Sequence, residues 1–217
     1  MKYLFFDMDG VLLDSEPRYL DRLRRHLAHY GVDCTREELQ RFVGMTSGRA
    51  AQILVEENRL PLTPQEFWAE ESRMFGILYR DDPELALFEG AKELLAILEE
   101  RGIRTALVSS TSAMGILLVL DRFGLTRCFD AVVSREMVET HKPSPEPYLT
   151  AARLLGAAPG DCLVVEDSPM GIAAGKAAGM EVAALRASVI RQDVSEADWT
   201  AENYQELCQS LERRGWL

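Results

Sequence analysis

Short runs rich in apolar residues alternate with helical patterns along most of this chain. Such runs, ended by glycine or polar residues, are typical of buried strands in a parallel sheet. Strands separated by helices indicate right-handed βαβ units, so the pattern predicts an α/β fold with a doubly wound parallel sheet of five strands. The expected strands are residues 3–6, 103–109, 130–134, 162–165 and 181–185. The expected helices between and after them are residues 91–101, 112–123, 145–155, 168–179 and 200–214.

The segment 15–83 differs, because it carries helical patterns alone. Leu20, Leu23 and Leu27 recur at helical spacing in its first part. We expect the core to consist of residues 1–14 and 84–217, with 15–83 inserted after the first strand. The expected helices of the insert are residues 15–30, a second begun by a Thr35/Glu38 capping box, residues 50–58, and a fourth from Pro64, capped by Thr63, to about Tyr79.

Composition limits the compartment and the partners. With 217 residues, of which 47% are hydrophobic and 27% charged, the chain suits a soluble globular protein of one large domain with an insert. No apolar stretch approaches the ~20 residues that span a bilayer, and the N-terminus has no signal-peptide pattern. The net charge of −11 argues against nucleic acid as the main partner. We therefore expect no membrane partner, and a monomer whose core and insert bury each other.

The cysteines agree with a cytoplasmic location. Cys34, Cys128, Cys162 and Cys208 are scattered along the chain without a close pair. That distribution favours reduced thiols over a disulfide framework or a zinc site.

Polar residues follow four of the expected strands, at the sheet edge where open α/β proteins bind ligands. Asp7 and Asp9 come directly after the first strand, and their spacing of two lets both lean toward one point. The others are Ser109 with Ser110 after the second strand, Lys142 after the third, and Glu166 with Asp167 after the fourth.

These residue types together predict a site that handles phosphate. An aspartate carboxylate can attack phosphorus, and a second carboxyl group can protonate the leaving oxygen and later deprotonate water. Neighbouring carboxylates repel each other, and Mg²⁺, which prefers carboxylates with phosphate oxygens, would balance them. A lysine and hydroxyl groups would hold the transferred oxygens. Each motif alone is readily explained as a turn or a helix cap. Turns and caps do not explain why four such motifs occur in order, each at the end of an expected strand.

The motifs resemble those of one enzyme superfamily. Asp-Met-Asp-Gly-Val-Leu-Leu-Asp-Ser-Glu, residues 7–16, is similar to the first motif of the haloacid dehalogenase-like (HAD) hydrolases, in the phosphatase and β-phosphoglucomutase-like branch. Ser109, His-Lys-Pro-Ser-Pro-Glu at 141–146 and Val-Val-Glu-Asp-Ser-Pro-Met-Gly-Ile at 164–172 match the later motifs. The resemblance covers the whole chain and implies a Rossmann-like core with strand order 5-4-1-2-3 under a helical cap.

The resemblance also implies a role for each matching residue. Asp7 would be the nucleophile and a Mg²⁺ ligand, and Asp9 the general acid/base whose backbone carbonyl also ligates Mg²⁺. The implied phosphate-binding residues are Ser109, Ser110 and Lys142, and Glu166 with Asp167 would be the acidic metal-binding pair.

Within the family, the residues favour a Mg²⁺-dependent phosphatase acting on a small phosphorylated metabolite, with a sugar or polyol phosphate preferred. Asp9 separates phosphatases from dehalogenases, and Tyr19 stands where β-phosphoglucomutases carry a cap histidine. The insert has no lysine, which argues against phosphonate hydrolysis. Mutase-like phosphotransfer and a non-catalytic phospholigand-binding protein remain as alternatives. The candidate substrate contacts of the cap are Glu16, Arg18, Tyr19, Thr46, Ser47 and Arg49.

Overall fold

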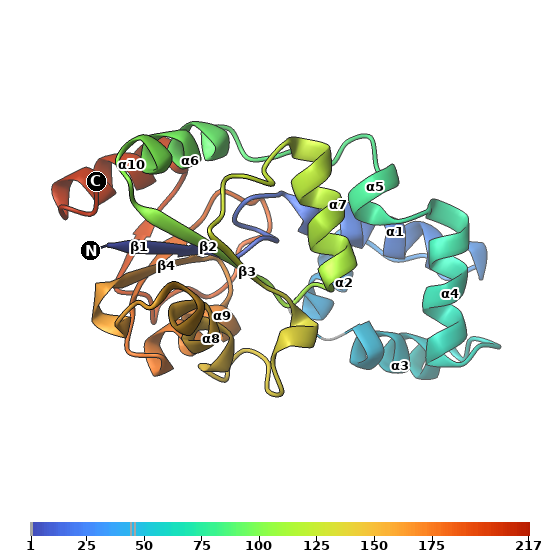
Figure 1. Cartoon of the computed structure of the whole chain (residues 1–217). Helices are drawn as coiled ribbons and strands as arrows, with labels where there is room; N and C mark the ends of the chain where they lie inside the picture. Colours follow the sequence, from blue (N-terminus) through green and yellow to red (C-terminus); the bar gives the residue numbers. More distant parts are fainter. Residues whose placement is uncertain (1, 44, 46) are drawn as a thin grey trace. The chain divides into compact units, whose positions relative to one another are not determined.

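The computed structural model describes residues 2–43, 45 and 47–217 of the chain (Figure 1). The chain separates into two compact units. Residues 1–14 and 86–217 form the first, called the core unit below, and Ser15–Leu85 form the second, called the cap unit. The second boundary lies two residues beyond Pro83, where the break in the helical pattern placed it.

The core unit is built on a parallel sheet that, within the described residues, has six strands in the order β3-β2-β1-β4-β5-β6. The strands are β1 (Tyr3–Phe6), β2 (Arg104–Val108), β3 (Ala131–Val133), β4 (Cys162–Glu166), β5 (Glu181–Leu185) and β6 (Trp199–Ala201). The expected α/β class and the order of the first five strands are confirmed. Strand β1 is central, so the carboxyl ends of β2 and β4 flank its own.

The sixth strand was not predicted, because residues from 200 onward were expected to be helical. Strand β6 pairs in parallel with β5, with Ala183 opposite Trp199 and Leu185 opposite Ala201. Trp199 and Ala201 are buried while Thr200 is exposed, which is the alternation of a strand with one covered face. Three residues are too few for that alternation to stand out in a sequence. The last helix begins only at Tyr204, where the Asn203 side chain accepts a hydrogen bond from Glu206 N.

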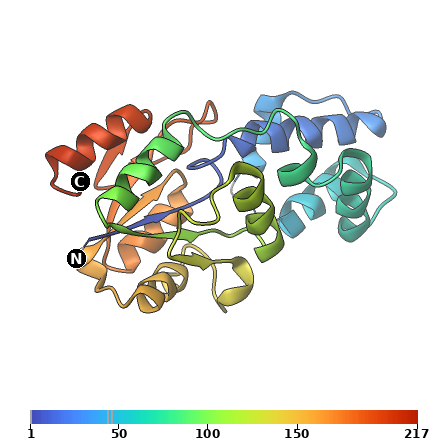
Figure 2. The same cartoon turned by 45° about the horizontal axis from the view of Figure 1, so that its top comes forward.

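Helices cover both faces of the sheet (Figures 1 and 2). Alternate strand residues face opposite sides, so Tyr3 and Phe5 pack in one apolar cluster with α8 and α9. Figure 1 shows α6 and α10 on the other side of the sheet. The helices of the core unit are α6 (Ala91–Glu100), α7 (Ala113–Phe123), α8 (Glu146–Leu155), α9 (Pro169–Ala177) and α10 (Tyr204–Arg213), with 3-10 turns η2 (Arg135–Met137) and η3 (Pro159–Asp161).

The cap unit is helical over its described residues, as the pattern predicted. Its helices are α1 (Ser15–His29), α2 (Arg36–Leu39), α3 (Ser47–Asn58), α4 (Pro64–Phe75) and α5 (Leu78–Asp81), with the 3-10 turn η1 (Gln40–Phe42). Capping boxes begin α2 at Thr35 and α4 at Thr63. The helix from Pro64 was expected to reach Tyr79, and that extent is wrong. Gly76 ends it with a φ of 72°, and the Asp81 carboxylate then accepts a hydrogen bond from Ile77 N, which starts the short α5.

A buried ion pair and a buried histidine join α1 to α4 inside the cap unit. Arg22 Nε donates to Glu71 Oε1 at 2.6 Å, and both side chains are less than 10% exposed. His26 is fully buried, and its ring lies 4.4 Å from that of Phe67 between centroids. None of the helices in the described part of the chain is both long enough and apolar enough to cross a bilayer.

Candidate active site

The loop after β1 folds back on itself at the carboxyl edge of the sheet. Asp7 N donates to Val165 O at 3.0 Å, which extends the pairing with β4 by one residue. Leu12 N then donates to Met8 O at 2.8 Å, closing a turn around Gly10, whose φ is 80°. A Cβ atom at Gly10 would lie only 2.0 Å from Asp167 Oδ2. Both the backbone conformation and the close approach to Asp167 therefore require glycine here.

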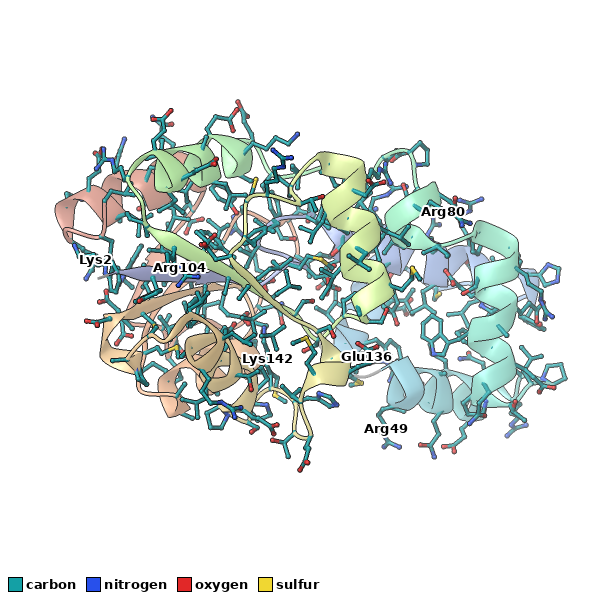
Figure 3. The ribbon with its side chains drawn as sticks, viewed as in Figure 1. Lys2, Arg49, Arg80, Arg104, Glu136 and Lys142 are labelled. Carbon is teal, nitrogen blue, oxygen red and sulfur yellow. The ribbon has the colours of Figure 1, made fainter. Side chains whose placement is uncertain are left out.

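Lys142 joins two of the predicted carboxylates. Its Nζ atom lies 2.6 Å from Asp7 Oδ1 and 2.6 Å from Glu166 Oε1, and it also donates to Val108 O at 3.1 Å. The Lys142 side chain is only 6% exposed, so these are interactions of a desolvated charge. Figure 3 shows Lys142 inside the core unit, and the residues it contacts lie at the carboxyl ends of three neighbouring strands. The structure thus brings together residues 135 and 24 positions apart in the sequence.

Glu166 is fully buried, and its carboxylate accepts five hydrogen bonds from described residues. Oε1 accepts from Lys142 and from the Tyr148 hydroxyl at 2.8 Å. Oε2 accepts from Asp167 N, Ser168 N and Ser168 Oγ at 3.0–3.2 Å. A carboxylate offers about four lone-pair positions, so protein donors already fill this one. The α9 backbone also lies against it, since a Cβ atom at Gly171 would be 1.7 Å from Oε1.

The electrostatics of this cluster oppose the charge on Asp7. Burial raises the pKa of Asp7 to about 8; Lys142 opposes the rise, and the carboxylates of Glu166 and Asp9 add to it. Burial also disfavours the charges on Lys142 and Glu166, but their mutual attraction is stronger. That attraction, with Asp7 contributing, holds the pKa of Lys142 well above its usual range, and Lys142 lowers the pKa of Glu166. Lys142 therefore stabilises the ionised form of Glu166, but its charge does not offset the effect of burial on Asp7.

The donor set fits a divalent metal ion. Asp7, Glu166 and Asp167 each present a ligand atom, and these three atoms lie within 4.8 Å of one another. All three residues are buried. Oxygen ligands of this kind suit a hard cation such as Mg²⁺ or Ca²⁺. The raised pKa of Asp7 agrees with this, because a nearby cation would supply the missing positive charge.

Asp9 and the segment after β2 form a second set of contacts. Thr111 Oγ1 donates to Asp9 Oδ2 at 2.9 Å, and Thr111 N donates to the Oγ atom of the buried Ser109 at 3.0 Å. Ser110, the other hydroxyl expected to bind phosphate, is exposed. The structure therefore links Ser109 to Asp9 through Thr111, beside the Lys142 cluster.

The expected cap contacts have different surroundings within the cap unit. Tyr19 stacks on Trp68 with 5.8 Å between ring centroids, and Glu16 is half-buried. Arg18 Nε contacts both carboxylate oxygens of Asp82 at 3.3 Å. Arg49 is exposed and donates to Gln52 Oε1 at 3.1 Å; its side chain projects outward from α3 in Figure 3. Ser47 begins α3, and Thr46 lies outside the described residues.

Several residues of the site were not predicted from the sequence. Tyr148 lies six residues beyond Lys142, and nothing in a helical pattern shows that its hydroxyl meets Glu166. Thr111 was one of several hydroxyl residues after β2, without a signal that singled it out. Gln192 lies after β5, in a segment without any motif, yet its Nε2 atom donates to Asp167 Oδ2 at 3.1 Å. Gly171 could have been found, because it stands inside the Glu-Asp-Ser-Pro-Met-Gly stretch already singled out.

A parallel α/β core with a carboxylate–lysine cluster at the ends of its central strands defines a class of phosphate-handling hydrolases, and comparison with known proteins agrees with that class. The family model described as haloacid dehalogenase-like hydrolase matches residues 4–185. This chain belongs to that family, as the resemblance of its motifs implied.

Its relatives include several phosphatases. The chain is 34% identical over 185 residues to a phosphorylated carbohydrates phosphatase of Thermotoga maritima, with 83% of this chain and 83% of the relative covered. It is also 34% identical to the fructose-1-phosphate phosphatase YqaB of Escherichia coli, with 84% of this chain and 95% of the relative covered. A bifunctional riboflavin kinase/FMN phosphatase of Arabidopsis thaliana is 34% identical, but this chain spans only 48% of its length. These phosphatases are phosphoric monoester hydrolases, which is the enzyme class expected from the sequence.

The fold has close counterparts among solved structures. A putative β-phosphoglucomutase from Thermotoga maritima superposes with a TM-score of 0.80 at 30% sequence identity, and 98% of this chain and 99% of that chain are covered.

Proposed function

We propose that this protein is a Mg²⁺-dependent phosphatase that hydrolyses a small phosphorylated metabolite through an aspartyl-phosphate intermediate. The observation that carries the proposal is the buried cluster in which Lys142 Nζ lies 2.6 Å from both Asp7 and Glu166, beside Asp167. Membership of the hydrolase family and the phosphatases among its relatives support it.

In the first half-reaction, an Asp7 carboxylate oxygen attacks the phosphorus atom of the substrate. The bond from phosphorus to the leaving oxygen breaks, and protonated Asp9 transfers its proton to that oxygen, which departs as an alcohol. Asp7 is then an acyl phosphate. Thr111 Oγ1, which contacts Asp9 Oδ2 at 2.9 Å, holds the acid/base carboxyl group in a fixed orientation for this transfer.

In the second half-reaction, the Asp9 carboxylate removes a proton from water as the water oxygen attacks the same phosphorus atom. The bond between phosphorus and Asp7 breaks, inorganic phosphate leaves, and both aspartates return to their starting protonation states. Lys142 and the Ser109 hydroxyl, with Ser110 as a further donor, would hold the oxygens of the transferred group, where negative charge is concentrated.

A bound Mg²⁺ would neutralise phosphate charge and keep Asp7 ionised. Asp7, Asp167 and the Asp9 backbone carbonyl are the ligands we propose. Glu166 was expected to be a ligand as well, and we now propose a different role for it. Its oxygens accept five hydrogen bonds from protein donors, so it would hold Lys142 and supply negative charge from outside the coordination shell.

Sugar or polyol phosphates are the substrates we propose, because the relatives that this chain covers over most of their length include phosphatases of phosphorylated carbohydrates. We propose that the cap unit supplies the contacts that select the leaving group, with Arg49, Tyr19, Glu16, Thr46 and Ser47 as candidates. Arg18 is not one of these proposed contacts. Its guanidinium group already pairs with Asp82 and Glu84 in the connection that ends the cap unit.

Phosphate release from a panel of phosphorylated sugars, polyols and an aryl phosphate tests the proposal. We expect release that needs Mg²⁺, stops in chelator, and requires more Mg²⁺ in Asp167→Ala than in the parent. Full activity in chelator, or an Asp167→Ala variant with an unchanged Mg²⁺ requirement, would contradict it. Analysis of the products distinguishes hydrolysis from the mutase alternative, which would return an isomeric sugar phosphate and no free phosphate. The absence of any turnover across the panel would leave the binding-protein alternative.

A further inference from the structure

The segment between β5 and β6, residues 186–198, carries none of the family motifs, yet it contacts two of the motif residues of the core unit, Asp14 and Asp167. Gln192 Nε2 donates to Asp167 Oδ2 at 3.1 Å. Four residues earlier, the buried Ser188 donates from Oγ to Asp14 Oδ1 at 2.8 Å and accepts from Ile190 N at 3.1 Å. This segment is therefore hydrogen-bonded both to the first motif, through Asp14, and to the motif after β4, through Asp167.

We propose that Gln192 is a positioning residue that fixes the carboxylate of Asp167 in the orientation needed to bind the metal ion; this rests on the function proposed above. An amide nitrogen is the only part of the glutamine side chain that can donate, and an ionised carboxylate can only accept. The nitrogen end of the Gln192 amide must therefore face the Asp167 carboxylate, and this hydrogen bond restrains the position of Asp167 Oδ2.

The other side of the same oxygen is also constrained. A Cβ atom at Gly10 would lie 2.0 Å from Asp167 Oδ2, so the backbone of the first motif passes directly beside the oxygen that Gln192 contacts. Asp167 Oδ2 thus lies between the backbone at Gly10 and the amide nitrogen of Gln192. Because the two carboxylate oxygens are rigidly linked, fixing one of them fixes the direction of the other.

The room around Asp167 is small. Asp167, Ser188 and Gln192 are among the residues that line a cavity of about 10 Å³. A volume of this size holds one water molecule at most. Without the Gln192 amide, the Asp167 carboxylate could turn toward this cavity and hydrogen-bond to water there, and it would have to turn back to bind a cation. A metal ligand that must be reoriented binds its ion more weakly, and loss of such outer contacts usually lowers metal affinity by about 10–100-fold.

Gln192→Leu tests the proposal, because leucine keeps most of the side-chain volume and removes the donor. The measurements are the Mg²⁺ concentration that gives half-maximal phosphate release, and the melting temperature in chelator and across a Mg²⁺ titration. Ser188→Ala is the matched control, since it removes a side-chain hydrogen bond from the same segment to Asp14 but none to Asp167. Gln192→Ala repeats the test without an added apolar side chain, in case leucine disturbs folding.

We expect Gln192→Leu and Gln192→Ala to need about 10–100-fold more Mg²⁺, in both the activity and the melting titration, with kcat at saturating Mg²⁺ close to the parent's. Ser188→Ala should keep the parent's Mg²⁺ requirement. A Gln192 variant that melts lower in chelator but binds Mg²⁺ as the parent does would show that Gln192 only packs the segment, and the proposal would be wrong. If the parent itself neither binds nor requires Mg²⁺, the proposed function fails and this inference fails with it.

Discussion

Replacing Lys142 with methionine should destabilise the core unit far more than the loss of an ordinary lysine would. Methionine keeps an unbranched apolar stem of similar length, so the main change is removal of the positive charge. Two carboxylates, Asp7 and Glu166, would then share a buried site without the cation that now lies 2.6 Å from each.

The size of the effect follows from burial. The side chains of Lys142, Asp7 and Glu166 are 6%, 12% and 0% exposed, so solvent screens these charges poorly. Removing one partner of a buried ion pair costs about 3–5 kcal/mol, because the remaining charge stays buried without compensation. For a chain of 217 residues, each kcal/mol lowers the melting temperature by about 2–4 °C, which gives a decrease of roughly 6–20 °C.

Lys176→Met is the matched control. Lys176 pairs with Asp198 at the surface of the core unit, where its side chain is 42% exposed. Surface pairs of this kind contribute about 0–1 kcal/mol. Both variants would be compared with the parent by thermal unfolding in chelator, followed by far-ultraviolet circular dichroism. A difference of 1 kcal/mol corresponds to about 2–4 °C. If the melting temperature of Lys142→Met lies within that range of the melting temperature of Lys176→Met, then Lys142, Asp7 and Glu166 do not form a buried set of interacting charges.

The pH dependence gives a second check on the same variant. The pKa of Glu166 is lowered from its ordinary value of 4.5, so its pairing stabilises the fold above that pH and the benefit is lost as pH falls. The pKa of Lys142 is raised above 10.5, so its benefit is complete below that pH and is lost as pH rises through the raised value. The difference between parent and variant should therefore be largest between about pH 5 and pH 10 and shrink in acid.

Three further predictions concern single groups of the site and the cap. Asp7→Asn should abolish turnover yet stabilise the metal-free protein increasingly from about pH 4 to pH 8. Over that range the parent's Asp7 ionises freely in the unfolded chain but keeps its proton in the folded one, where its pKa is raised to about 8, so the parent loses stability that asparagine does not; a stability difference that is flat with pH would contradict this. Tyr148→Phe leaves Glu166 with one donor fewer and should lower the free energy of unfolding by about 1–3 kcal/mol in urea titrations, whereas no change would show that the bond is dispensable. Arg49→Ala should lower kcat/KM for the preferred metabolite by about 1.5–3 kcal/mol in transition-state free energy while hardly affecting acetyl phosphate; equal losses on both would exclude a role in selecting the leaving group.

The regular parts of the fold could be predicted because local signals agreed with tertiary structure. The apolar run Tyr3–Phe6 became the central strand, and the capping residues Thr35, Thr63 and Ser168 begin helices where expected. The sixth strand could not be predicted, because its three residues are held by pairing with β5 and carry too short a pattern of their own.

The site was predictable to the extent that its chemistry lies in motifs at strand ends. Asp7, Lys142, Glu166 and Asp167 were singled out because a phosphate site needs carboxylates and a cation together. Their hydrogen-bond partners were less accessible to sequence reasoning. The Gln192 amide meets Asp167 across 25 positions of sequence, and only the fold of the segment after β5 brings it there.

Direct detection of the aspartyl phosphate tests the central claim most closely. The protein would be mixed with Mg²⁺ and the best substrate of the panel, quenched in acid within the first turnover, digested, and analysed by mass spectrometry. We predict that the peptide containing Asp7 gains the mass of one phosphoryl group, that fragmentation places the group on Asp7, and that Asp7→Asn gains none. Rapid hydrolysis with no modified peptide at any quench time, or a phosphoryl group on another residue, would contradict the account.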